Sequence, residues 1–458
     1  MSPVPRTCEV AIVGAGLSGL VAARRLVQGG VDEIVVLEAG DRVGGRTLNH
    51  QVDSEQVIEL GGQWAARSHE RLLSLARELG VGVFPTYDEG RNVLWLRGHR
   101  YLYRGNPPLR ADPTGLVDFA QSAWRLDLLS RRVPIGAPWA ARRASRYDAV
   151  TFQAWLSRAT RTSTARAVWA IAAALTFGGA PHDVSLLYVL HHVRGAGGVS
   201  CLLDVTGGAQ ELRFDGGSQA LSLALAEAVA PRVHLGRPVA RIVQHEDALT
   251  IEHGEGTLRA SRAVVAMSPP DAERIVVEPP LPHARRRLQQ RVTMARGLKV
   301  QAVYPEAFWR TEGLSGQAVS DEGALAMSFD NSPPSGRPGV LVGFATYDPR
   351  VRLALPSALE FDAQARRRAT LGSLARYFGA SALRPTDYIE HNWGNEPFLH
   401  GCIPALPPGT LTECGPALTA PVGSLHWAGA EAASTWDGYM EGAVQSGERA
   451  AAEILDRR

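Results

Sequence analysis

The chain has 458 residues and a formal net charge of +2, and hydrophobic residues make up 45% and charged residues 21% of it. This composition is typical of a globular protein with two or three domains, and so small a net charge gives no indication of a nucleic-acid partner. No apolar run approaches the roughly 18 residues that cross a bilayer, the N-terminus lacks the apolar core of a signal peptide, and the four cysteines form no CxxC pair. We therefore expect a cytoplasmic protein with no membrane anchor, no metal and reduced thiols.

The chain opens with a strand–helix–strand pattern. A short apolar run at 9–13 predicts a strand, a glycine turn follows at 14–19, and residues 17–27 carry apolar side chains at helical spacing. The apolar run at 34–37 does not alternate with polar residues, which is typical of a strand buried on both faces. This pattern predicts a βαβ unit at the start of the chain.

The rest of the chain alternates between helical and strand patterns. Residues 86–206 carry mostly helical patterning, with a helix expected over 152–169. Later strands are expected over 233–235, 240–243, 249–252, 263–267, 299–304 and 425–428, and later helices over 359–378 and 440–454. This order favours two domains that interleave along the chain.

A glycine motif lies between the first strand and the first helix. Gly14, Gly16 and Gly19 have the spacing GxGxxG, and Glu38 ends the second strand. Such glycines allow a tight turn and a close approach of the backbone to a pyrophosphate, while the helix start attracts its charge. Glu38 can accept hydrogen bonds from both ribose hydroxyls. The context predicts a dinucleotide site, although FAD and NAD share this fingerprint.

Lysine occurs once in the sequence. Lysine and arginine together number 48, yet Lys299 is the only lysine. Arginine cannot replace lysine where a compact, titratable amine is required. Lys299 is therefore the first candidate for a chemical role.

Further strings separate a flavin site from a nicotinamide site. Gly44-Gly45-Arg46 follows Glu38 closely, and Glu59-Leu60-Gly61-Gly62-Gln63-Trp64 comes soon after. Later strings include Leu298-Lys299-Val300, Asn392-Trp393, Trp427-Ala428-Gly429-Ala430-Glu431 and Trp436-Asp437-Gly438-Tyr439-Met440-Glu441-Gly442-Ala443. With these strings the chain resembles the flavin-containing amine oxidase family, the monoamine oxidase group in particular and its bacterial soluble type.

The resemblance implies FAD as the cofactor and a two-domain α/β fold. The first domain would be a doubly wound FAD-binding domain, Rossmann-like and of the glutathione-reductase type, built from residues 1–85, 207–297 and 395–458. A mixed α+β substrate domain would take residues 86–206 and 298–394. The residues implied to bind FAD are Gly14, Gly16, Gly19, Glu38, Gly44, Gly45, Arg46, Gly61, Gly62, Val239, Trp393, Glu431, Met440 and, through a possible covalent link, Cys402.

The resemblance also implies catalytic roles for three residues. The lysine equivalent to Lys299 holds a water at the flavin N5, and Trp393 matches a tryptophan near the flavin. Tyr439 matches one ring of an aromatic cage that flanks the substrate nitrogen, where aromatic faces can orient an amine. Further residues implied to line the substrate cavity are Trp64, Leu175, Thr176, Leu203, Gln210 and Ile403.

The sequence departs from the family pattern around Cys402. In the membrane-bound monoamine oxidases the second cage tyrosine directly follows the cysteine that bonds the flavin. Here Ile403 follows Cys402, and the segment His400 to Gly409 is one residue shorter. Either Ile403 or Cys402 therefore replaces that tyrosine. The cage is then half built, or Trp393 or Trp64 completes it. Covalent attachment through Cys402 is possible but not favoured, because the thiolate would have to lie beside the flavin.

The implied reaction is the oxidation of an amine to an imine, which hydrolyses to an aldehyde or ketone plus ammonia or a smaller amine, while O2 is reduced to H2O2. Three alternatives stay open. An L-amino-acid oxidase would need a cation, usually arginine, for the substrate carboxylate. A diamine or polyamine oxidase would need an acidic residue deep in the cavity, for which Asp204 is one candidate. A non-catalytic flavin-binding protein is the third.

Two more expectations concern partners and metals. The family suggests a homodimer by analogy. The adjacent pair His191 and His192 is not predicted to bind metal, because adjacent side chains on a helix do not share a face. We interpret the pair as structural.

Overall fold

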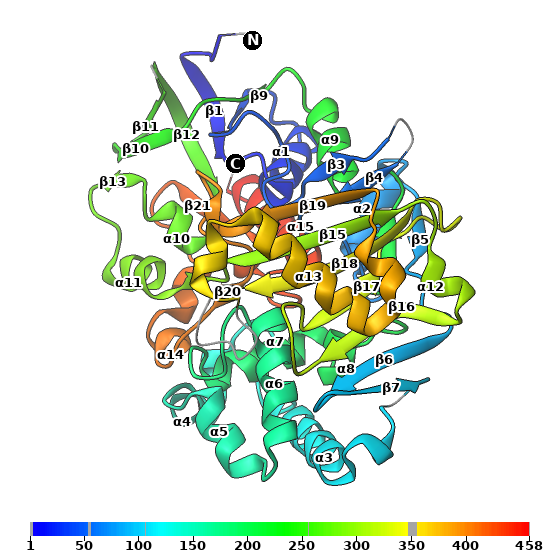
Figure 1. Cartoon of the computed structure of the whole chain (residues 1–458). Coiled ribbons are helices and arrows are strands. Elements are labelled where there is room, and N and C mark those ends of the chain that lie inside the picture. Colours follow the sequence, from blue (N-terminus) through cyan, green and yellow to red (C-terminus); the bar gives the residue numbers. More distant parts are fainter. Residues whose placement is uncertain (1–2, 54–55, 106, 255, 347–354, 458) are drawn as a thin grey trace.

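The computed structural model of the protein describes residues 3–53, 56–105, 107–254, 256–346 and 355–457. Figure 1 shows one sheet at the top of the view, a second sheet with helix α13 in front of it, and a group of helices below both. The chain contributes to the upper sheet at its beginning, in its middle and near its end. Its two large sheets are therefore built from segments that alternate along the sequence.

The upper sheet contains the βαβ unit. Within the described residues it has eight strands in the order β13-β10-β11-β12-β1-β2-β9, with β21 paired to β12. Strand β1 is parallel to β2 and β12, and the apolar strands β2 and β21 are wholly buried. The strands are β1 (Thr7–Val13), β2 (Ile34–Leu37), β9 (Val233–His234), β10 (Val239–Gln244), β11 (Leu249–His253), β12 (Gly256–Ala266), β13 (Val276–Glu278) and β21 (Leu425–Ala428).

The first and last helices of the chain pack against each other beside this sheet. Helix α1 (Leu17–Gln28) contacts α15 (Met440–Leu455), and α9 (Gln219–Ala228) also contacts α1. A Cβ on Gly447 would lie 2.3 Å from the carbonyl oxygen of Ser18, so only glycine allows this approach. The end of the chain is thereby fixed to the glycine turn.

The second sheet has a mixed topology. Its described strands follow the order β19-β15-β18-β17-β16-β6-β7, antiparallel except for the β6–β16 pair. Helix α13 (Ala363–Phe378) shares a hydrophobic core with it. The strands are β6 (Arg91–Leu96), β7 (His99–Tyr103), β15 (Gly297–Tyr304), β16 (Leu314–Ser320), β17 (Met327–Asp330), β18 (Gly339–Thr346) and β19 (Asp387–Asn392).

A group of helices between β7 and β8 forms the lower part of the molecule (Figure 1). They share one apolar core that includes Phe152, Trp169, Phe177 and Tyr188. Side chains cap three of them, because Thr151, Thr162 and Ser185 accept hydrogen bonds from the first helical turns. The helices are α3 (Pro113–Ser130), α4 (Ala144–Asp148), α5 (Phe152–Ala159), α6 (Ser163–Thr176), α7 (Leu186–Ala196) and α8 (Val199–Leu203).

Shorter elements connect these layers. The paired short strands are β3 (Asn49–Gln51) with β4 (Val57–Glu59), β5 (Val83–Pro85) with β8 (Leu212–Phe214), and β14 (Thr293–Met294) with β20 (Pro404–Ala405). The remaining α-helices are α2 (Glu70–Glu78), α10 (Pro269–Ala272), α11 (His283–Arg291), α12 (Phe308–Thr311) and α14 (Thr410–Cys414), and two 3-10 helices used below are η5 (Trp393–Asn395) and η7 (Ala430–Ala432). Across the described residues, no helix is both long and apolar enough to cross a membrane.

The predicted elements agree with the structure at the chain's beginning and end, and the strands expected between 233 and 304 correspond to β9, β10, β11, β12 and β15. Three differences lie elsewhere in the chain. The helix expected over 152–169 is two helices, because Thr162 caps a new start at α6. The helix expected over 359–378 begins at Ala363, where Asp362 accepts a hydrogen bond from the amide of Ala365. Strands β6 and β7 lie in the region expected to be mostly helical. The domain boundaries stay a prediction.

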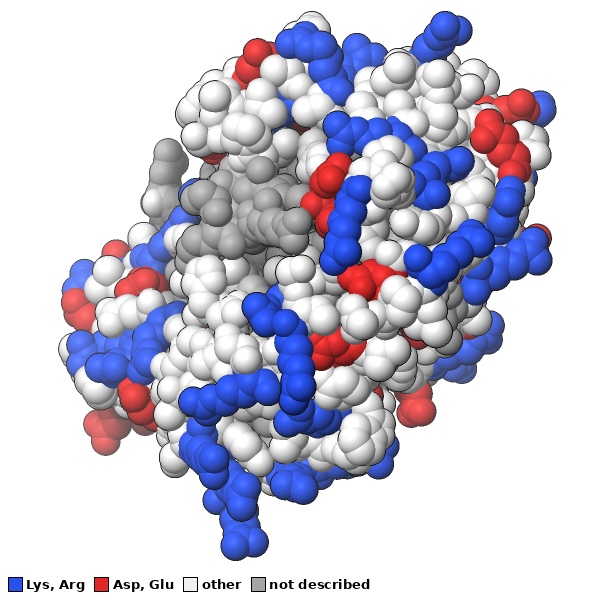
Figure 2. Space-filling view, turned by 60° about the horizontal axis from the view of Figure 1, so that its bottom comes forward, with Lys and Arg blue, Asp and Glu red and all other residues white. Residues whose placement is uncertain are grey.

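The surface carries basic side chains without one dominant patch on the face seen in Figure 2. They are scattered there among acidic and uncharged residues. Lys299, the only lysine, is 4% exposed, so the basic side chains at the surface are arginines. The one lysine lies inside the protein.

Candidate active site

The glycine turn joins β1 to α1 and leaves the start of the helix without a side-chain cap. Gly14 has a φ of +103°, and a Cβ on Gly19 would lie 2.0 Å from the Gly14 carbonyl oxygen, so neither position accepts a side chain. Gly16 precedes α1 and forms a β-bridge with Gly44. Uncapped amides and the helix dipole together form a site that favours an anion such as a pyrophosphate.

Glu38 is fixed at the end of β2 by two backbone amides. Its Oε2 accepts a hydrogen bond from the amide of Ala15 at 2.8 Å, and its Oε1 accepts one from the amide of Gly40 at 2.8 Å. Each carboxylate oxygen keeps a further lone pair. The carboxylate is thus held beside the turn with capacity to accept hydrogen bonds from two hydroxyls of a ribose.

Arg46 is held by a buried carboxylate from the other end of the chain. Its guanidinium binds both oxygens of Glu431, at 2.6 and 3.1 Å, and also donates to the carbonyl oxygen of Cys402 at 3.0 Å. Glu431 lies on η7 and is 6% exposed. A bidentate pair of this kind fixes the direction of the guanidinium.

One cavity of about 1450 Å³ contains most of the residues predicted from the sequence. Gly19 and Glu431 do not line it, because Gly19 packs against Gly14 and Glu431 acts on the cavity through Arg46. The predicted residues that do line it are Gly14, Gly16, Glu38, Gly44, Gly45, Arg46, Gly61, Gly62, Trp64, Leu175, Thr176, Leu203, Gln210, Val239, Lys299, Trp393, Cys402, Ile403, Tyr439 and Met440.

The part of the cavity wall contributed by α6, α8, β17 and β18 is apolar. It presents aliphatic and aromatic side chains, namely Ile171, Leu175, Leu202, Leu203, Met327, Phe329 and Phe344. Trp64 packs against Phe329 and Phe344, with ring centroids 5.2 and 5.9 Å apart. Thr176 of α6 is polar, but its hydroxyl donates to the carbonyl oxygen of Ala172. Gln210, between α8 and β8, adds a buried Oε1 that has no hydrogen-bond partner.

Lys299 lies on β15 and lines the same cavity. Its Nζ donates to the carbonyl oxygen of Gly61 at 2.9 Å and also to Oε1 of Gln63. Burial lowers the pKa of Lys299 from 10.5 to about 7, although the nearby carboxylate of Glu59 opposes that shift. Both the amine and the ammonium form are therefore accessible near neutral pH.

A buried polar network that the sequence did not predict supports Lys299. Gln63 donates to Oδ1 of Asn331 at 2.7 Å, and Asn331 donates to Oε1 of Gln301 at 2.7 Å. Gln301 in turn donates to the carbonyl oxygen of Glu59, whose carboxylate pairs with Arg213 at 2.8 Å. Of these residues, only Gln63 and Glu59 belong to the Glu59 to Trp64 motif of the sequence. The network makes the position of the Lys299 amine depend on several elements.

Comparisons with known proteins assign the family. Residues 17–455 match the family model for flavin containing amine oxidoreductase. The chain is 41% identical to "Putative flavin-containing monoamine oxidase AofH" of Mycobacterium tuberculosis, over 98% of this chain and 97% of that protein. The chain belongs to the flavin-containing amine oxidoreductase family. It is thus an FAD-dependent amine oxidase, as the sequence predicted.

Two solved structures are similar over nearly the whole chain. Putrescine oxidase bound to putrescine is 32% identical, with a TM-score of 0.92, and the match covers 99% of this chain and 100% of that one. Cyclohexylamine oxidase from Brevibacterium oxydans is 33% identical, with a TM-score of 0.91, over 98% of this chain and 99% of that one. The predicted fold, an FAD-binding α/β domain with a substrate domain, is confirmed.

The residues of the glycine turn fit FAD. A Cβ on Gly45 would lie 3.3 Å from the Cα of Gly16, so side chains at either position would fill the space beside the uncapped helix start. Trp393, on η5, donates to the carbonyl oxygen of Leu60 at 2.8 Å and packs its ring beside Gly61. Glu38, the turn and Arg46 are the groups that would hold the ribose and the pyrophosphate.

Tyr439 has three ring neighbours, of which His192 lies on α7. Its ring centroid lies 5.1 Å from that of Trp436, 5.7 Å from that of His192 and 6.0 Å from that of His69. Across the described residues, no ring contact joins Tyr439 to Trp64 or Trp393. Completion of an aromatic cage by Trp64 or Trp393 therefore stays a prediction.

Cys402 lines the cavity as a protonated thiol. Its Sγ lies 3.4 Å from the carbonyl oxygen of Ala295, and burial raises its pKa above the ordinary value of a thiol. The thiolate is the form that would bond a flavin, and this environment disfavours it.

Proposed function

We propose that this amine oxidase acts on apolar primary or secondary monoamines. The observation that carries the proposal is the apolar wall formed by α6, α8, β17 and β18, which contributes no arginine within the described residues. Gln210 adds one buried acceptor without a partner, which suits a single amino group. Such a wall binds a hydrocarbon side chain and offers nothing to a carboxylate.

The site residues would prepare the amine for oxidation. Burial against Leu175, Leu203 and Tyr439 disfavours the ammonium ion and favours the neutral amine, whose lone pair is required for the reaction. Bound FAD supplies the acceptor for a hydride equivalent from the carbon next to nitrogen. The iminium product hydrolyses to an aldehyde or ketone and ammonia or a smaller amine, and O2 takes up the electrons as H2O2.

Lys299 would act at the flavin side of the cavity. Its Nζ is fixed beside Gly61 by two hydrogen bonds, and its lowered pKa makes the amine available as donor or acceptor near neutrality. We propose that it holds the water or oxygen that the family resemblance implies at N5. Tyr439 and Trp393 would orient the substrate and the flavin.

The two enzymatic alternatives find less support. An amino-acid oxidase would need a cation near the apolar wall, whereas the arginines that line the cavity, Arg42, Arg46, Arg237, Arg274 and Arg296, come from other segments. For a diamine oxidase, Asp204 is exposed and is not among the cavity-lining residues. Asp183 and Asp437 do line the cavity, but both already contact histidines.

FAD attachment and assembly are proposed on the same basis. We propose that FAD is bound without a covalent link, which the protonated state of the Cys402 thiol supports. The homodimer and the cytoplasmic location expected from the sequence stay predictions.

A substrate panel tests the proposed function. The purified yellow protein is mixed with benzylamine, cyclohexylamine, putrescine or L-leucine, and peroxide is measured in a coupled assay. Benzylamine and cyclohexylamine should have the highest kcat/KM. Asp204→Asn serves as a control. It should leave the ratios of kcat/KM between the four substrates unchanged, because that side chain lies outside the cavity. A higher kcat/KM for putrescine or L-leucine would refute the proposed substrate class.

A further inference from the structure

A buried carboxylate and two histidines lie beside the proposed substrate site without an assigned role. Asp437 lines the large cavity just before α15, and His191 and His192 come from α7. The Oδ1 of Asp437 is 3.1 Å from Nδ1 of His192 and 3.8 Å from Nε2 of His191. Asp437 is 5% exposed, His191 6% and His192 2%, so all three residues are nearly closed off from solvent.

The three groups compensate one another's charge. Burial opposes ionisation of Asp437, but the neighbouring histidines outweigh it and hold the pKa of this carboxyl below its usual range. Burial lowers the pKa of His191 below its usual range, although the charge of Asp437 opposes that shift. One proton can therefore move between Asp437 and His191 without leaving an uncompensated charge in the protein interior.

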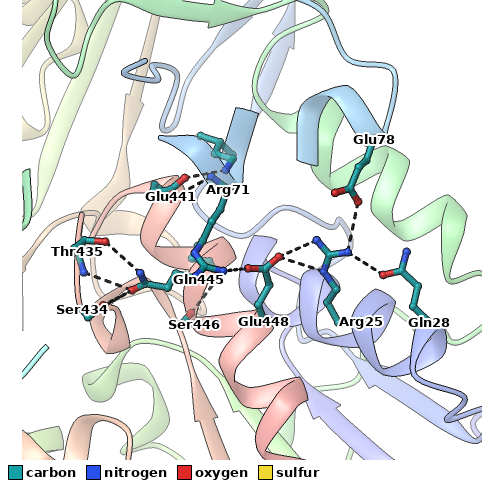
Figure 3. A network of polar contacts seen from close by, with 12 residues as sticks. Arg25, Gln28, Arg71, Glu78, Ser434, Thr435, Glu441, Gln445, Ser446 and Glu448 are labelled. Carbon is teal, nitrogen blue, oxygen red and sulfur yellow. Dashed lines mark hydrogen bonds and ion pairs between the residues drawn. The ribbon is translucent and has the colours of Figure 1, made fainter. Parts of the chain in front are cut away.

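His191 also lines a second cavity, which is separate from the first. This cavity has a volume of about 540 Å³, and no described residue lines both cavities. Its wall includes Arg71 and Glu448, which form an ion pair, and Gln445, which accepts a hydrogen bond from the amide of Ser434 at 2.6 Å (Figure 3). The wall also contains apolar side chains such as Leu411 and Leu418, and its charged and amide groups are the ones that can bind water.

The free nitrogen of His191 completes the geometry. Its Nε2 is the nitrogen near Asp437, and its Nδ1 is buried without a hydrogen-bond partner. His192 contacts Asp437 through its Nδ1, but it does not line the second cavity. Of the two histidines, only His191 connects the carboxylate that lines one cavity with the wall of the other.

We propose that Asp437 and His191 form a proton path between the substrate site and the second cavity. The substrate's ammonium N–H bond breaks, and its proton forms an O–H bond on Asp437. Asp437 then gives this proton to Nε2 of His191, while Nδ1 of His191 releases its own proton to water in the second cavity. The gap of 3.8 Å has to shorten for transfer, as catalytic hydrogen bonds commonly do when substrate binds.

The path fits the proton balance of the proposed function, on which it rests. An ammonium substrate loses one proton and one hydride equivalent to become an iminium ion. Reduction of O2 to H2O2 then takes back the hydride equivalent and one proton. During reduction of O2 the proton moves along the path in the opposite direction. Nδ1 of His191 takes up a proton from water in the second cavity, and Nε2 returns one to Asp437. His191 thereby recovers its starting tautomer in every turnover.

The other ionisable groups around the path are buried phenols or members of ion pairs. Burial raises the pKa of Tyr188 and of Tyr439, both of which feel the charge of Asp437, so both stay protonated. Arg71 and Glu448 both line the second cavity and form an ion pair. Arg449 also lines it and is paired with Glu453, which does not. Asp437 and His191 are the groups left to exchange a proton along the path.

Anaerobic single-turnover kinetics test the path. The holoenzyme is mixed with benzylamine in weak buffer, and a pH-indicator dye reports proton release while absorbance reports flavin reduction. His191→Gln is compared with the wild type and with His253→Gln, which alters a buried histidine on β11 outside both cavities. The wild type and His253→Gln should release one proton per flavin reduced, and His191→Gln should reduce its flavin at least about tenfold more slowly at pH 7.

The pH profile separates a proton path from a structural role. Above the pKa of benzylammonium the substrate arrives neutral, so the rate of His191→Gln should approach that of the wild type. Imidazole should restore the rate of His191→Ala at pH 7. The same deficit at every pH, no effect of imidazole, or a His191→Gln profile equal to that of the wild type would overturn the path. A wild type whose flavin no amine reduces would instead disprove the proposed function.

Discussion

Replacement of Lys299 by methionine removes the one buried amine and should change how stability depends on pH. In the folded protein the pKa of Lys299 is lowered from 10.5 to about 7, mainly by burial. The unfolded chain therefore binds more protons between these values, and wild-type stability rises with pH in that window. Linkage over the interval from pH 7 to pH 9 gives an increase of about 2 kcal/mol in the free energy of unfolding.

The assay is urea unfolding of both holoenzymes at pH 7 and pH 9 in the same excess of FAD. Lys299→Met also loses the hydrogen bonds to Gly61 and Gln63, but that loss does not vary with pH. The wild type should gain about 2 kcal/mol relative to Lys299→Met between the two pH values. Leu298→Met, on the same strand, should keep the wild-type slope. Equal slopes for the wild type and Lys299→Met would refute a lowered pKa and with it the proposed role of this amine.

Two further predictions concern the cofactor. Arg46→Met leaves the buried carboxylate of Glu431 without its partner and should weaken FAD binding at least about tenfold, measured by fluorescence titration of the apoprotein; unchanged affinity would show that Arg46 does not contribute. Acid unfolding should release FAD from the wild type as completely as from Cys402→Ala, because the thiol of Cys402 is protonated; flavin that migrates with the denatured wild type would demonstrate a covalent link.

The beginning of the fold could be predicted because its signals are local. The glycine turn, the apolar runs and Glu38 all lie within the first 38 residues, and β2 has the bounds expected from the sequence. Strands β6 and β7 were not predicted, because they alternate only weakly and β6 pairs with β16 more than 200 residues later. Pairing between strands so far apart in the sequence produces no pattern within the few residues of one strand.

The site shows the same division between local and distant signals. Lys299 stood out by composition, but Gln63 and Asn331, which connect it to the buried network, come from distant segments and carry ordinary amide side chains. Helix geometry alone predicts a structural role for the pair His191 and His192. That rule overlooked a carboxylate from another segment, since Asp437 approaches both His191 and His192 from outside the helix.

Anaerobic reduction followed by reoxidation tests the amine oxidase mechanism most directly. Benzylamine is added to the yellow holoenzyme without oxygen, the loss of flavin absorbance is recorded, and oxygen is then admitted. The account predicts bleaching by benzylamine, return of the oxidised spectrum with oxygen, and one H2O2 and one benzaldehyde per flavin. A flavin that stays oxidised with every amine, or that is reoxidised without peroxide, would contradict it.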